Sequence, residues 1–468
     1  MNELVLKNCK FVDSQKEYYI GMADGKIAEI SKQPLKSDDK IDVNGKIVLP
    51  GLIDPHVHFR DPGLTYKEDF KSGSLAAANG GFTTVIDMPN TIPKTNTEKA
   101  FKKKIKIGES KSVIDFSLHS GFNNVGEMKK IAKHYPSSFK IFMDLKNDIN
   151  LEKIFENISL IEQEYLDFQR TSKLKQVKWK PMITAHCENK FIIHKNIEIL
   201  KKNIGVRRNQ AIIYSDTRPS EAENVSVKQA IDLAKKYKVK LHICHLSSKD
   251  SLDIVNNEKS FIYQFNKKEQ INNPNEKQEM ELSFEVTPHH LFLNSNAFNE
   301  YGTIAKTNPP LRHIGENLRI TNDLKHIHMI GTDHAPHTLK EKQKGVWDSL
   351  PGIPNLETTL PLFLTQVNRG NISLDTIVKI FSKNPSKLFN LKNKGSIEIG
   401  KDADLIIIDL KKEGNFNLDD FYTKANYSPF ENWSYNGIAT MTIANGKVIM
   451  KDGDLIDKNK GKYIPYIN

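Results

Sequence analysis

The sequence predicts an α/β protein whose middle is a (β/α)₈ barrel, and three observations lead to that prediction. Between residues 50 and 395, apolar strand-like runs alternate with helix-like runs, which is typical of a parallel sheet. The runs make about eight units, the number that closes a barrel. Ionisable residues repeatedly follow the strand-like runs, as in barrels whose sites lie at the carboxyl ends of their strands. The expected strands lie near 49–58, 82–88, 113–118, 138–143, 181–186, 239–245, 282–287 and 326–332, and helix-like stretches include 97–106, 125–134, 151–169, 221–237 and 315–325.

Both ends of the chain carry short strand-like runs accompanied by Asn-Gly and Asp-Gly pairs, which are hairpin turn signals. Neither end holds enough strand to bury a sheet by itself. We therefore expect residues 1–49 and 396–468 to combine into one small β-sandwich domain that flanks a catalytic barrel of residues 50–395. Two stretches rich in Lys, Gln, Asn and Glu, 165–180 and 256–281, do not fit a compact barrel and are predicted to be exposed surface insertions.

The composition narrows the class of function and the compartment. With 468 residues, 38% of them hydrophobic and 27% charged, the chain has ordinary globular composition and ample material for a large core. Its formal net charge is +11, but the lysines are scattered and no nucleic-acid-binding motif accompanies them, so neither nucleic acid nor a membrane is an expected partner. The start lacks the apolar region of a signal peptide, no apolar run approaches the roughly 18 residues of a membrane helix, and three cysteines cannot form a disulfide framework. Together these features predict a cytoplasmic protein.

Polar residues at the ends of the expected strands predict a metal site. His56 and His58 end the first strand, and residues two apart on a strand point to the same face, so both imidazoles can reach one ion. Taken alone, this pair fits a metal site no better than it fits two histidines that share a face by chance. The ionisable groups at the other strand ends favour the metal, since in one barrel all of them would meet at one rim. These groups are Asp87, Lys140, His186, Glu188, His242, His245, Asp333, His334 and His337.

Four motifs carry a resemblance to a known family. They are His56–Gly63 (HVHFRDPG), Met88–Asn90 (MPN), Asn308–Arg312 (NPPLR) and Asp333–His337 (DHAPH). In these motifs the chain resembles the amidohydrolase superfamily, within it the cyclic amidohydrolases, and most of all the dihydroorotase family of class I type. The resemblance covers nearly the whole chain, and it implies the barrel together with its split β domain.

The resemblance implies a centre of two zinc ions with a hydroxide and a carboxylated lysine between them. The implied ligands are His56, His58 and Asp333 for one ion and His186 and His245 for the other. Lys140 would bridge the ions as a carbamate formed with CO₂. A protonated lysine has no lone pair to give, and two cations about 3.5–4 Å apart need an anion between them. Some relatives have an aspartate at this place, and Asp144 is near, so both residues stay open as the bridge.

Other histidines and cysteines near the implied ligands are given different roles. His242 and His245 are three residues apart on one strand and should face opposite sides, so only one of them can be a ligand. The family pattern selects His245, which leaves His242 packed among the helices. Cys187 and Cys244 are expected to be small buried hydrophobic residues without a role in the chemistry.

The resemblance also implies the substrate. It predicts reversible hydrolysis of the ring amide of (S)-dihydroorotate to N-carbamoyl-L-aspartate, the third step of pyrimidine synthesis, with Asp333 passing a proton from the attacking hydroxide to the leaving nitrogen. The clue among the residues is Arg60, because arginine offers a bidentate fork to a carboxylate such as the one on this substrate. The implied substrate-binding residues are Arg60, Asn90 and His337 for the carboxylate, and Asn308, Pro351 and Gly352 for the rest of the ring.

Two other functions stay open. An allantoinase, hydantoinase or dihydropyrimidinase would share the metals and the barrel but would not need Arg60 or His337, because its substrate lacks the ring carboxylate. A relative that has lost its metals would be a scaffold, although the intact set of ligand types argues against this. A homodimer is common in the family, whereas nothing in the chain indicates a docking surface for aspartate transcarbamoylase. Residues 338–349 are a candidate for a mobile loop beside the site.

Overall fold

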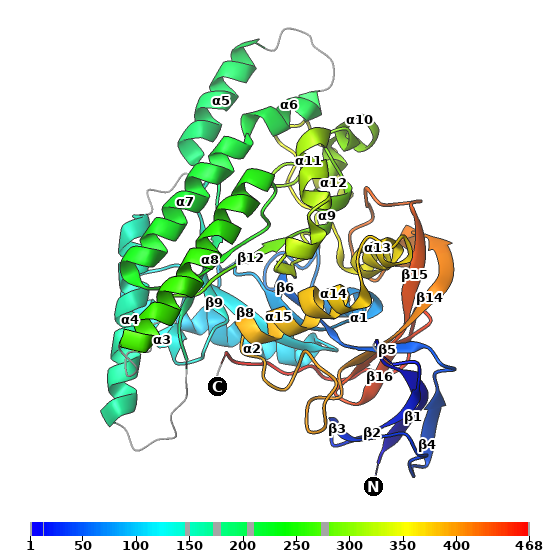
Figure 1. Cartoon of the computed structure of the whole chain (residues 1–468). Helices are drawn as coiled ribbons and strands as arrows, with labels where there is room; N and C mark the ends of the chain where they lie inside the picture. Colours follow the sequence, from blue (N-terminus) through cyan, green and yellow to red (C-terminus); the bar gives the residue numbers. More distant parts are fainter. Residues whose placement is uncertain are drawn as a thin grey trace.

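The structure is a computed structural model of the chain and describes residues 2–12, 14–145, 150–171, 179–203, 210–272 and 280–466. Among these residues, eight parallel strands form one sheet in the order β13-β12-β11-β10-β9-β8-β7-β6 (Figure 1). The two edges of this sheet approach each other where Val57 pairs with His334 and the amide of His58 donates to the carbonyl of His334 at 2.9 Å. The sheet is therefore a nearly closed barrel, and the predicted fold class is confirmed. Its strands are β6 (Leu52–Val57), β7 (Phe82–Asp87), β8 (Asp115–Gly121), β9 (Ser138–Phe142), β10 (Met182–His186), β11 (Lys240–Ile243), β12 (Leu282–Val286) and β13 (Met329–Ile330).

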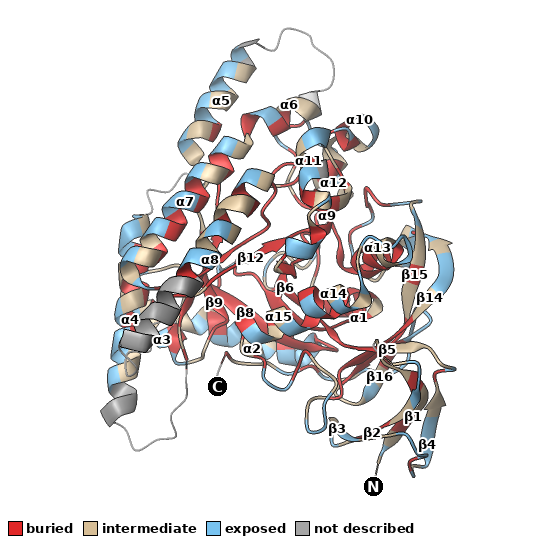
Figure 2. Cartoon of the chain, viewed as in Figure 1, coloured by how far each residue is buried: buried red, intermediate tan, exposed pale blue. Residues whose placement is uncertain are grey.

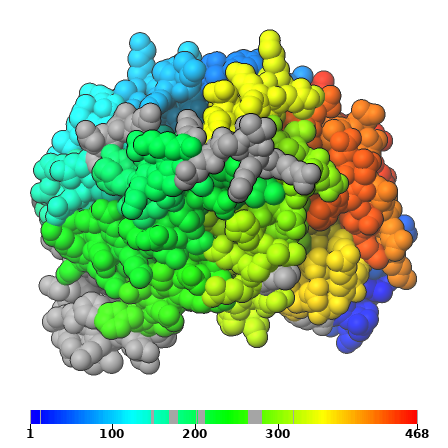
Figure 3. Space-filling model, turned by 90° about the horizontal axis from the view of Figure 1, so that it is seen from above, coloured from blue at the N-terminus to red at the C-terminus, as the bar shows by residue number. Residues whose placement is uncertain are grey.

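Helices cover the outside of the barrel, with buried residues on their inner faces and exposed residues on their outer faces (Figure 2). Seen from above, the light-blue, cyan, green and yellow-green segments follow one another along one side of the molecule in sequence order, and yellow segments lie beside the blue ones at the top (Figure 3). Within the described residues, no helix combines the length and the apolar character that crossing a membrane requires. The outer helices are α1 (Phe70–Asn79), α2 (Glu98–Lys111), α3 (Val125–Ala132), α4 (Leu151–Thr171), α7 (Ser220–Tyr237), α8 (Lys249–Asn272), α11 (Ile314–Thr321), α13 (Leu356–Asn368), α14 (Leu374–Val378) and α15 (Asn384–Leu388). Further helices are α5 (Lys190–Asn203), α6 (Gln210–Thr217), α9 (Pro288–Phe292), α10 (Ala297–Tyr301) and α12 (Leu339–Lys342).

Local capping signals fix where the helices beside the barrel rim begin. At the start of α1, the Asp69 carboxylate accepts from the amide of Ser72 at 2.9 Å, and the Ser72 hydroxyl accepts from the amide of Asp69 at 3.2 Å. At the start of α12, Thr338 and Glu341 form the same reciprocal box. These caps satisfy amides that would otherwise lack partners, and they hold the ends of two loops that follow β6 and β13.

The described parts of the two predicted insertions are largely helical. Helix α4 continues to Thr171 and α8 continues to Asn272, so the first part of each stretch is helical. Near the first stretch Trp179 is buried and packs on Tyr165 with 5.3 Å between ring centroids. The polar composition of these stretches therefore reflects in part the exposed faces of long helices. The remaining parts, 172–178 and 273–279, lie outside the described residues.

The terminal strands form a second sheet, with the described order β17-β16-β15-β14-β5-β1-β2-β3 and β4 paired with β1. The two ends of the chain meet where β5 pairs antiparallel with β14, and the buried side chains of Leu6, Val48, Leu405 and Ile443 belong to its core. The predicted boundaries of this domain remain a prediction. The strands are β1 (Leu4–Lys10), β2 (Glu17–Ala23), β3 (Lys26–Ser31), β4 (Asp39–Asp42), β5 (Ile47–Pro50), β14 (Leu405–Asn415), β15 (Ser434–Ala444), β16 (Lys447–Lys451) and β17 (Asp454–Leu455).

Two segments of the C-terminal part return from this sheet to the barrel. Between β14 and β15, Phe416 and Phe430 share a buried cluster with Leu293 and Ile353, which lie beyond the carboxyl ends of β12 and β13. After β17, the chain runs beside β8, where the amide of Phe116 donates to the carbonyl of Lys462 at 3.0 Å. The first of these segments brings residues 416–433 close to the rim at which the polar residues gather.

Candidate metal and substrate site

Five predicted metal ligands come together at the carboxyl ends of the barrel strands. His56 lies on β6 and His58 follows it, His186 ends β10, and His245 and Asp333 follow β11 and β13. All five side chains are buried. The ring of His56 lies 5.2 Å from that of His58 and 5.3 Å from that of His245, and the rings of His186 and His245 are 4.7 Å apart, measured between centroids. The two predicted sets of ligands therefore form one continuous cluster.

The histidines of the first set direct one nitrogen each toward Asp333. The Nε2 atoms of His56 and His58 lie 3.3 Å and 3.0 Å from Asp333 Oδ1. Their other nitrogens face acceptors, since His56 Nδ1 contacts the Glu285 carboxylate and His58 Nδ1 lies 2.7 Å from the Asn90 amide oxygen. Each Nδ1 can therefore carry the proton and leave the lone pair of Nε2 facing the cluster, which is how metal-binding histidines are commonly oriented.

Electrostatics keeps this set in the protonation states that a metal requires. Burial lowers the pKa of His58 to about 4, so its imidazole is neutral near pH 7. Burial opposes ionisation of Asp333, but the neighbouring His56 and His58 hold its pKa well below the ordinary value. The neutral imidazole of His58, the second imidazole of His56 and one carboxylate are a suitable donor set for zinc and other divalent ions.

The second set has an imidazole nitrogen without a partner. His186 Nε2 lies 2.8 Å from Glu188 Oε2, which leaves His186 Nδ1 facing His245 Nε2 at 3.0 Å. The Nδ1 atom of His245 is buried and has no hydrogen-bond partner among the described residues. Burial and the nearby His186 lower the pKa of His245 well below its ordinary value, so the ring is neutral. A pair of imidazoles in which one nitrogen of the neutral His245 ring is unsatisfied fits a bound metal, because a buried polar atom is costly without a partner.

Lys140 and Asp144, the two candidates for a bridging ligand, lie in different surroundings. Lys140 is buried on β9, and its Nζ lies 2.8 Å from Cys244 Sγ. The atoms of Cys244, His56 and His245 that can bind a metal lie within 4.8 Å of one another, so Lys140 borders both ligand sets. Asp144 Oδ1 is 3.6 Å from His186 Nε2, and Asp144 Oδ2 accepts from Arg218 at 2.6 Å. Its charge is thus already compensated by an arginine.

His242 lies inside the barrel, so its predicted place among the helices is wrong. His242 Nδ1 is 2.9 Å from the Ser283 hydroxyl and its Nε2 is 3.1 Å from Glu285 Oε2. The alternation of faces applies only along a strand, and β11 ends at Ile243. His245 then adopts a positive φ of 35°, which redirects the chain. Both histidines therefore face the interior, although only His245 reaches the other predicted ligands.

Two carboxylates that the motifs do not reveal orient the predicted ligands. Glu285 on β12 lies between His56 and His242, and Glu188 lies between His186 and Arg218. Burial opposes the charge of Glu285, while His56 and His242 hold its pKa well below the ordinary value. The signal for Glu285 was present as a single acidic residue within an apolar strand, because such a buried charge needs a partner.

Arg60 is a buried guanidinium without a carboxylate partner. Arg60 is only 6% exposed. Its Nε donates to the Pro336 carbonyl at 3.2 Å, and its Nη2 lies 3.2 Å from His337 Nε2. Within the described part of the chain, no carboxylate oxygen comes within 4.0 Å of it. A buried cation of this kind is stable only with an anion nearby, so the geometry favours an anionic ligand at Arg60.

The other predicted substrate residues are only partly gathered around Arg60. Asn90 contacts His58, and the carbonyl of Pro351 lies 3.1 Å from His337 Nε2. The carbonyl of Gly352 accepts from Lys342 at 2.9 Å. Asn308 is half-buried, and its side-chain oxygen accepts from Tyr214 at 2.5 Å.

The predicted mobile loop, 338–349, is tied down by two buried lysines. Lys342 donates to the carbonyls of Lys306, Leu350 and Gly352 at 2.9–3.1 Å. Lys306 donates to the carbonyls of Val346 and Ser349 at 2.7 Å and 2.6 Å. These bonds fix the wall of the site that carries Gly352.

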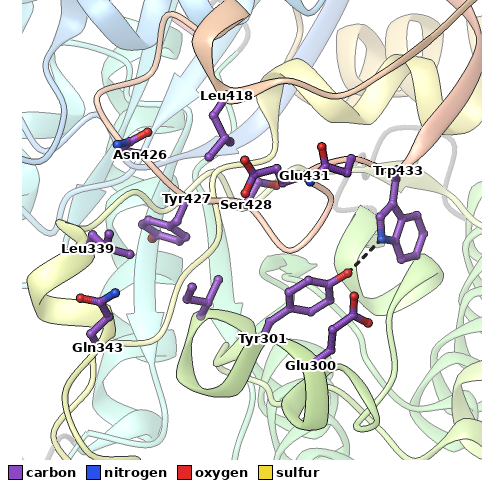
Figure 4. Close-up of a pocket in the computed structure, with 12 residues that line it drawn as sticks. Glu300, Tyr301, Leu339, Gln343, Leu418, Asn426, Tyr427, Ser428, Glu431 and Trp433 are labelled. Carbon is purple, nitrogen blue, oxygen red and sulfur yellow. Dashed lines mark hydrogen bonds between the residues drawn. The ribbon is translucent and has the colours of Figure 1, made fainter.

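A surface cavity of about 500 Å³ lies behind this wall (Figure 4). Tyr427 separates the cavity from the site, because its ring lines the cavity while its hydroxyl contacts the amide of His337 and the carbonyl of Gly352, both at 3.2 Å. Tyr301 and Trp433 line the opposite side and are joined by a hydrogen bond of 3.2 Å. None of the predicted metal ligands lines this cavity.

The sequence and the fold match known proteins over almost their full lengths. Residues 47–449 match the amidohydrolase family. A dihydroorotase from Methanothermobacter thermautotrophicus is 44% identical over 465 residues, which covers 99% of this chain and 98% of that protein. A dihydroorotase from Methanosphaera stadtmanae is 42% identical over 468 residues, with 99% and 100% covered. Among solved structures, the L-hydantoinase from Arthrobacter aurescens has a TM-score of 0.87 at 29% identity and covers 99% of this chain and 100% of its own.

Proposed function

The chain belongs to the amidohydrolase family, and from that premise we propose that it catalyses the reversible hydrolysis of (S)-dihydroorotate to N-carbamoyl-L-aspartate. The relatives named dihydroorotases support this choice of substrate. The observation that carries it is Arg60, a buried guanidinium without a carboxylate partner in the described chain, beside His337. Dihydroorotate carries a carboxylate on its ring. Hydantoin, allantoin and dihydrouracil carry none and would leave this cation unpaired.

We propose that the five clustered ligands hold two zinc ions. His56, His58 and Asp333 would bind one ion, and His186 and His245 would bind the other. Lys140 is the better candidate for the bridge, as a carbamate, because it borders both sets whereas Asp144 is already paired with Arg218. When bound, the ions would supply an activated hydroxide at neutral pH and would polarise the ring carbonyl. The neutral imidazoles of His58 and His245 and the unsatisfied nitrogen of His245 support this assignment.

The residues of the chain bind the ring and move its proton. Arg60, Asn90 and His337 would orient the ring by its carboxylate, with Asn308, Pro351 and Gly352 along its remaining edge. Asp333 is ionised and faces the cluster, so it can accept the proton of the attacking hydroxide and pass it to the ring nitrogen as the amide bond breaks. In the reverse direction the same carboxylate takes a proton from the ureido nitrogen and cyclises carbamoyl aspartate. The reaction is the third step of pyrimidine synthesis, and we assign it to the cytoplasm, in keeping with three unpaired cysteines.

Side-by-side ring opening of four substrates tests the proposal. We expect the purified zinc-loaded protein to open dihydroorotate with a kcat/KM at least about 100-fold above hydantoin, allantoin and dihydrouracil, since discrimination by a site built for a polar group is large. Metal analysis should find about two zinc ions per chain. Faster opening of hydantoin or dihydrouracil would assign the chain to the hydantoinase side of the family, and protein purified without bound metal would favour a scaffold.

Arg60→Met provides the matched variant. It removes the guanidinium but leaves the metal ligands in place, so KM for dihydroorotate should rise by about 10–100-fold or more while the zinc content stays the same. Lys111→Met is the control, because Lys111 pairs with the adjacent Asp61 at 2.6 Å without contacting the predicted carboxylate site. A similar KM for both variants would contradict the role of Arg60.

A further inference from the structure

Lys67 is a buried lysine in the loop between β6 and α1, and it has no part in the chemistry proposed above. Its side chain is 6% exposed. Its Nζ lies 3.2 Å from His337 Nδ1 and 2.9 Å from Glu341 Oε1 on α12. The ion pair with Glu341 compensates its charge, so the contact with His337 is not needed to neutralise Lys67. The contact instead affects the imidazole of His337.

One neighbour of each ring nitrogen points to the same tautomer, and Glu341 Oε2, 3.8 Å from His337 Nδ1, is too distant to accept a hydrogen bond from it. The ammonium of Lys67 is only a donor, so His337 Nδ1 must accept from it through a lone pair. The carbonyl of Pro351 is only an acceptor, so His337 Nε2, 3.1 Å away, must carry the hydrogen. Burial, together with Arg60, Lys67 and Lys342, holds the pKa of His337 far below its ordinary value, which excludes the doubly protonated ring near pH 7.

This tautomer changes the meaning of the contact between His337 and Arg60. Arg60 Nη2 lies 3.2 Å from His337 Nε2, and both atoms now carry hydrogens, so the pair is two adjacent donors and not a hydrogen bond. Arg60 and this N–H form a site for an oxygen that accepts from the guanidinium and shares the Nε2 hydrogen with the Pro351 carbonyl in a three-centre hydrogen bond, and a carboxylate oxygen is such an acceptor. Without the donor at Nδ1, the ring could place its hydrogen there and turn a lone pair toward the substrate carboxylate.

We propose that Lys67 is a positioning residue that locks His337 in its Nε2–H tautomer, and that it thereby creates the second donor of the site for the substrate carboxylate. This inference rests on the proposed function for the identity of the anion, but not for the tautomer. Lys67 acts on substrate binding through His337, so it should affect KM and leave the chemical step unchanged.

Steady-state kinetics with three variants tests the role. Lys67→Met removes the donor and is expected to raise KM for dihydroorotate about 10–100-fold, with kcat within about threefold of wild type. Lys67→Arg keeps a donor and should restore KM to within about threefold. Lys424→Met is the control, because Lys424 ties the same loop through the carbonyl of Thr65 and the carboxylate of Asp69, both at 2.7 Å, without contacting His337. An unchanged KM in Lys67→Met, or an equal rise in Lys424→Met, would overturn the proposal.

Nitrogen-15 spectra of the histidine-labelled protein test the tautomer without substrate. With His337 assigned through His337→Asn, the wild-type ring should show a hydrogen on Nε2 and none on Nδ1, and Lys67→Met should lose this preference. A wild-type ring protonated on Nδ1 refutes the inference even if Lys67→Met does not fold. If the wild-type protein does not open dihydroorotate, the proposed function fails, and this spectrum alone decides the role of Lys67.

Discussion

Two clusters of buried charges lie at opposite ends of the barrel and differ in how their charges are balanced. At the amino end, Lys394 follows α15 and donates to three carboxylates, those of Asp115 at 2.8 Å, Asp404 at 2.6 Å and Asp402 at 3.1 Å. Three acidic groups this close would suit a metal by geometry alone, and their oxygens lie within 4.8 Å of one another. The chain itself supplies the cation, so this cluster needs no ligand.

The cluster at the carboxyl end is incomplete without a ligand. In the described chain, His245 Nδ1 has no hydrogen-bond partner and no carboxylate oxygen lies within 4.0 Å of the Arg60 guanidinium. His56, His58 and His186 each have one nitrogen facing an acceptor and the other facing the cluster. The comparison indicates that a gathering of acidic and imidazole groups does not by itself mark a functional site. Unsatisfied buried atoms also occur elsewhere in the described chain, as in Trp179 and His328, so what marks the site is that such atoms coincide with gathered ligands and a buried cation.

The largest expected effect is the loss of turnover in Asp333→Ala. This carboxylate is both a proposed metal ligand and the group that moves the proton, so kcat should fall by about 10⁴-fold or more in both directions. Asp402→Asn, at the other end of the barrel, should lower stability and leave kcat unchanged. The measurement is kcat for ring opening and for ring closure at matched zinc content. If Asp333→Ala kept the wild-type kcat with metal bound, the cluster at the carboxyl end would matter no more for catalysis than the cluster around Lys394.

Lys394→Met is expected to give the largest loss of stability. It leaves the buried carboxylates of Asp115 and Asp404 without their cation, whereas Asp402 keeps its pair with Lys26 at 2.5 Å, and it should lower the free energy of unfolding by about 3–5 kcal/mol. The predicted metal ligands at the other end do not contact Lys394, so the folded variant should retain its kcat. Chemical denaturation monitored by circular dichroism measures the loss. A change below about 1 kcal/mol would show that the cluster is not completed by Lys394 alone.

Glu285→Gln is expected to have an intermediate effect, which is a weaker binding of the metal. The Glu285 carboxylate contacts His56 Nδ1 and His242 Nε2, so its loss frees the ring of His56 to turn or to exchange tautomers. Metal affinity should fall about 10–100-fold, as for other residues that orient ligands. Competition of the metal-free protein with a chromophoric chelator measures it. Glu164→Gln, which removes an exposed partner of Lys129, is the control and should keep wild-type affinity.

The sequence predicted the parts of the molecule that have a local or repeated signal. The barrel follows from alternating runs, and the pair His56 and His58 follows from spacing along a strand. His242 was misplaced because the alternation rule was carried past Ile243, where the strand ends and the backbone turns at a positive φ. The limit of the rule is thus a strand boundary, which a single sequence locates poorly.

Contacts between distant positions had no such signal. Lys394 and Asp115 are 279 residues apart, and Lys67 and His337 are 270 residues apart. Nothing local distinguishes Lys67 or Lys394 from the many surface lysines of a chain with 68 lysines and arginines. The same holds for Glu285, whose only hint was its place within an apolar strand. Their roles depend on which strands close the barrel and on what lies across it.

The smallest expected effect is that of Lys424→Met, which sharpens the comparison between buried and exposed lysines. Lys424 also bonds a carboxylate, that of Asp69 at 2.7 Å, but its side chain is 37% exposed whereas that of Lys394 is 3% exposed. Water and salt screen the exposed pair, so its loss should lower the free energy of unfolding by less than about 1 kcal/mol, and by less still at high salt. Denaturation of both lysine variants at low and high salt measures the difference. If the two variants lost equal stability, burial would not be what separates the completed cluster from an ordinary surface pair.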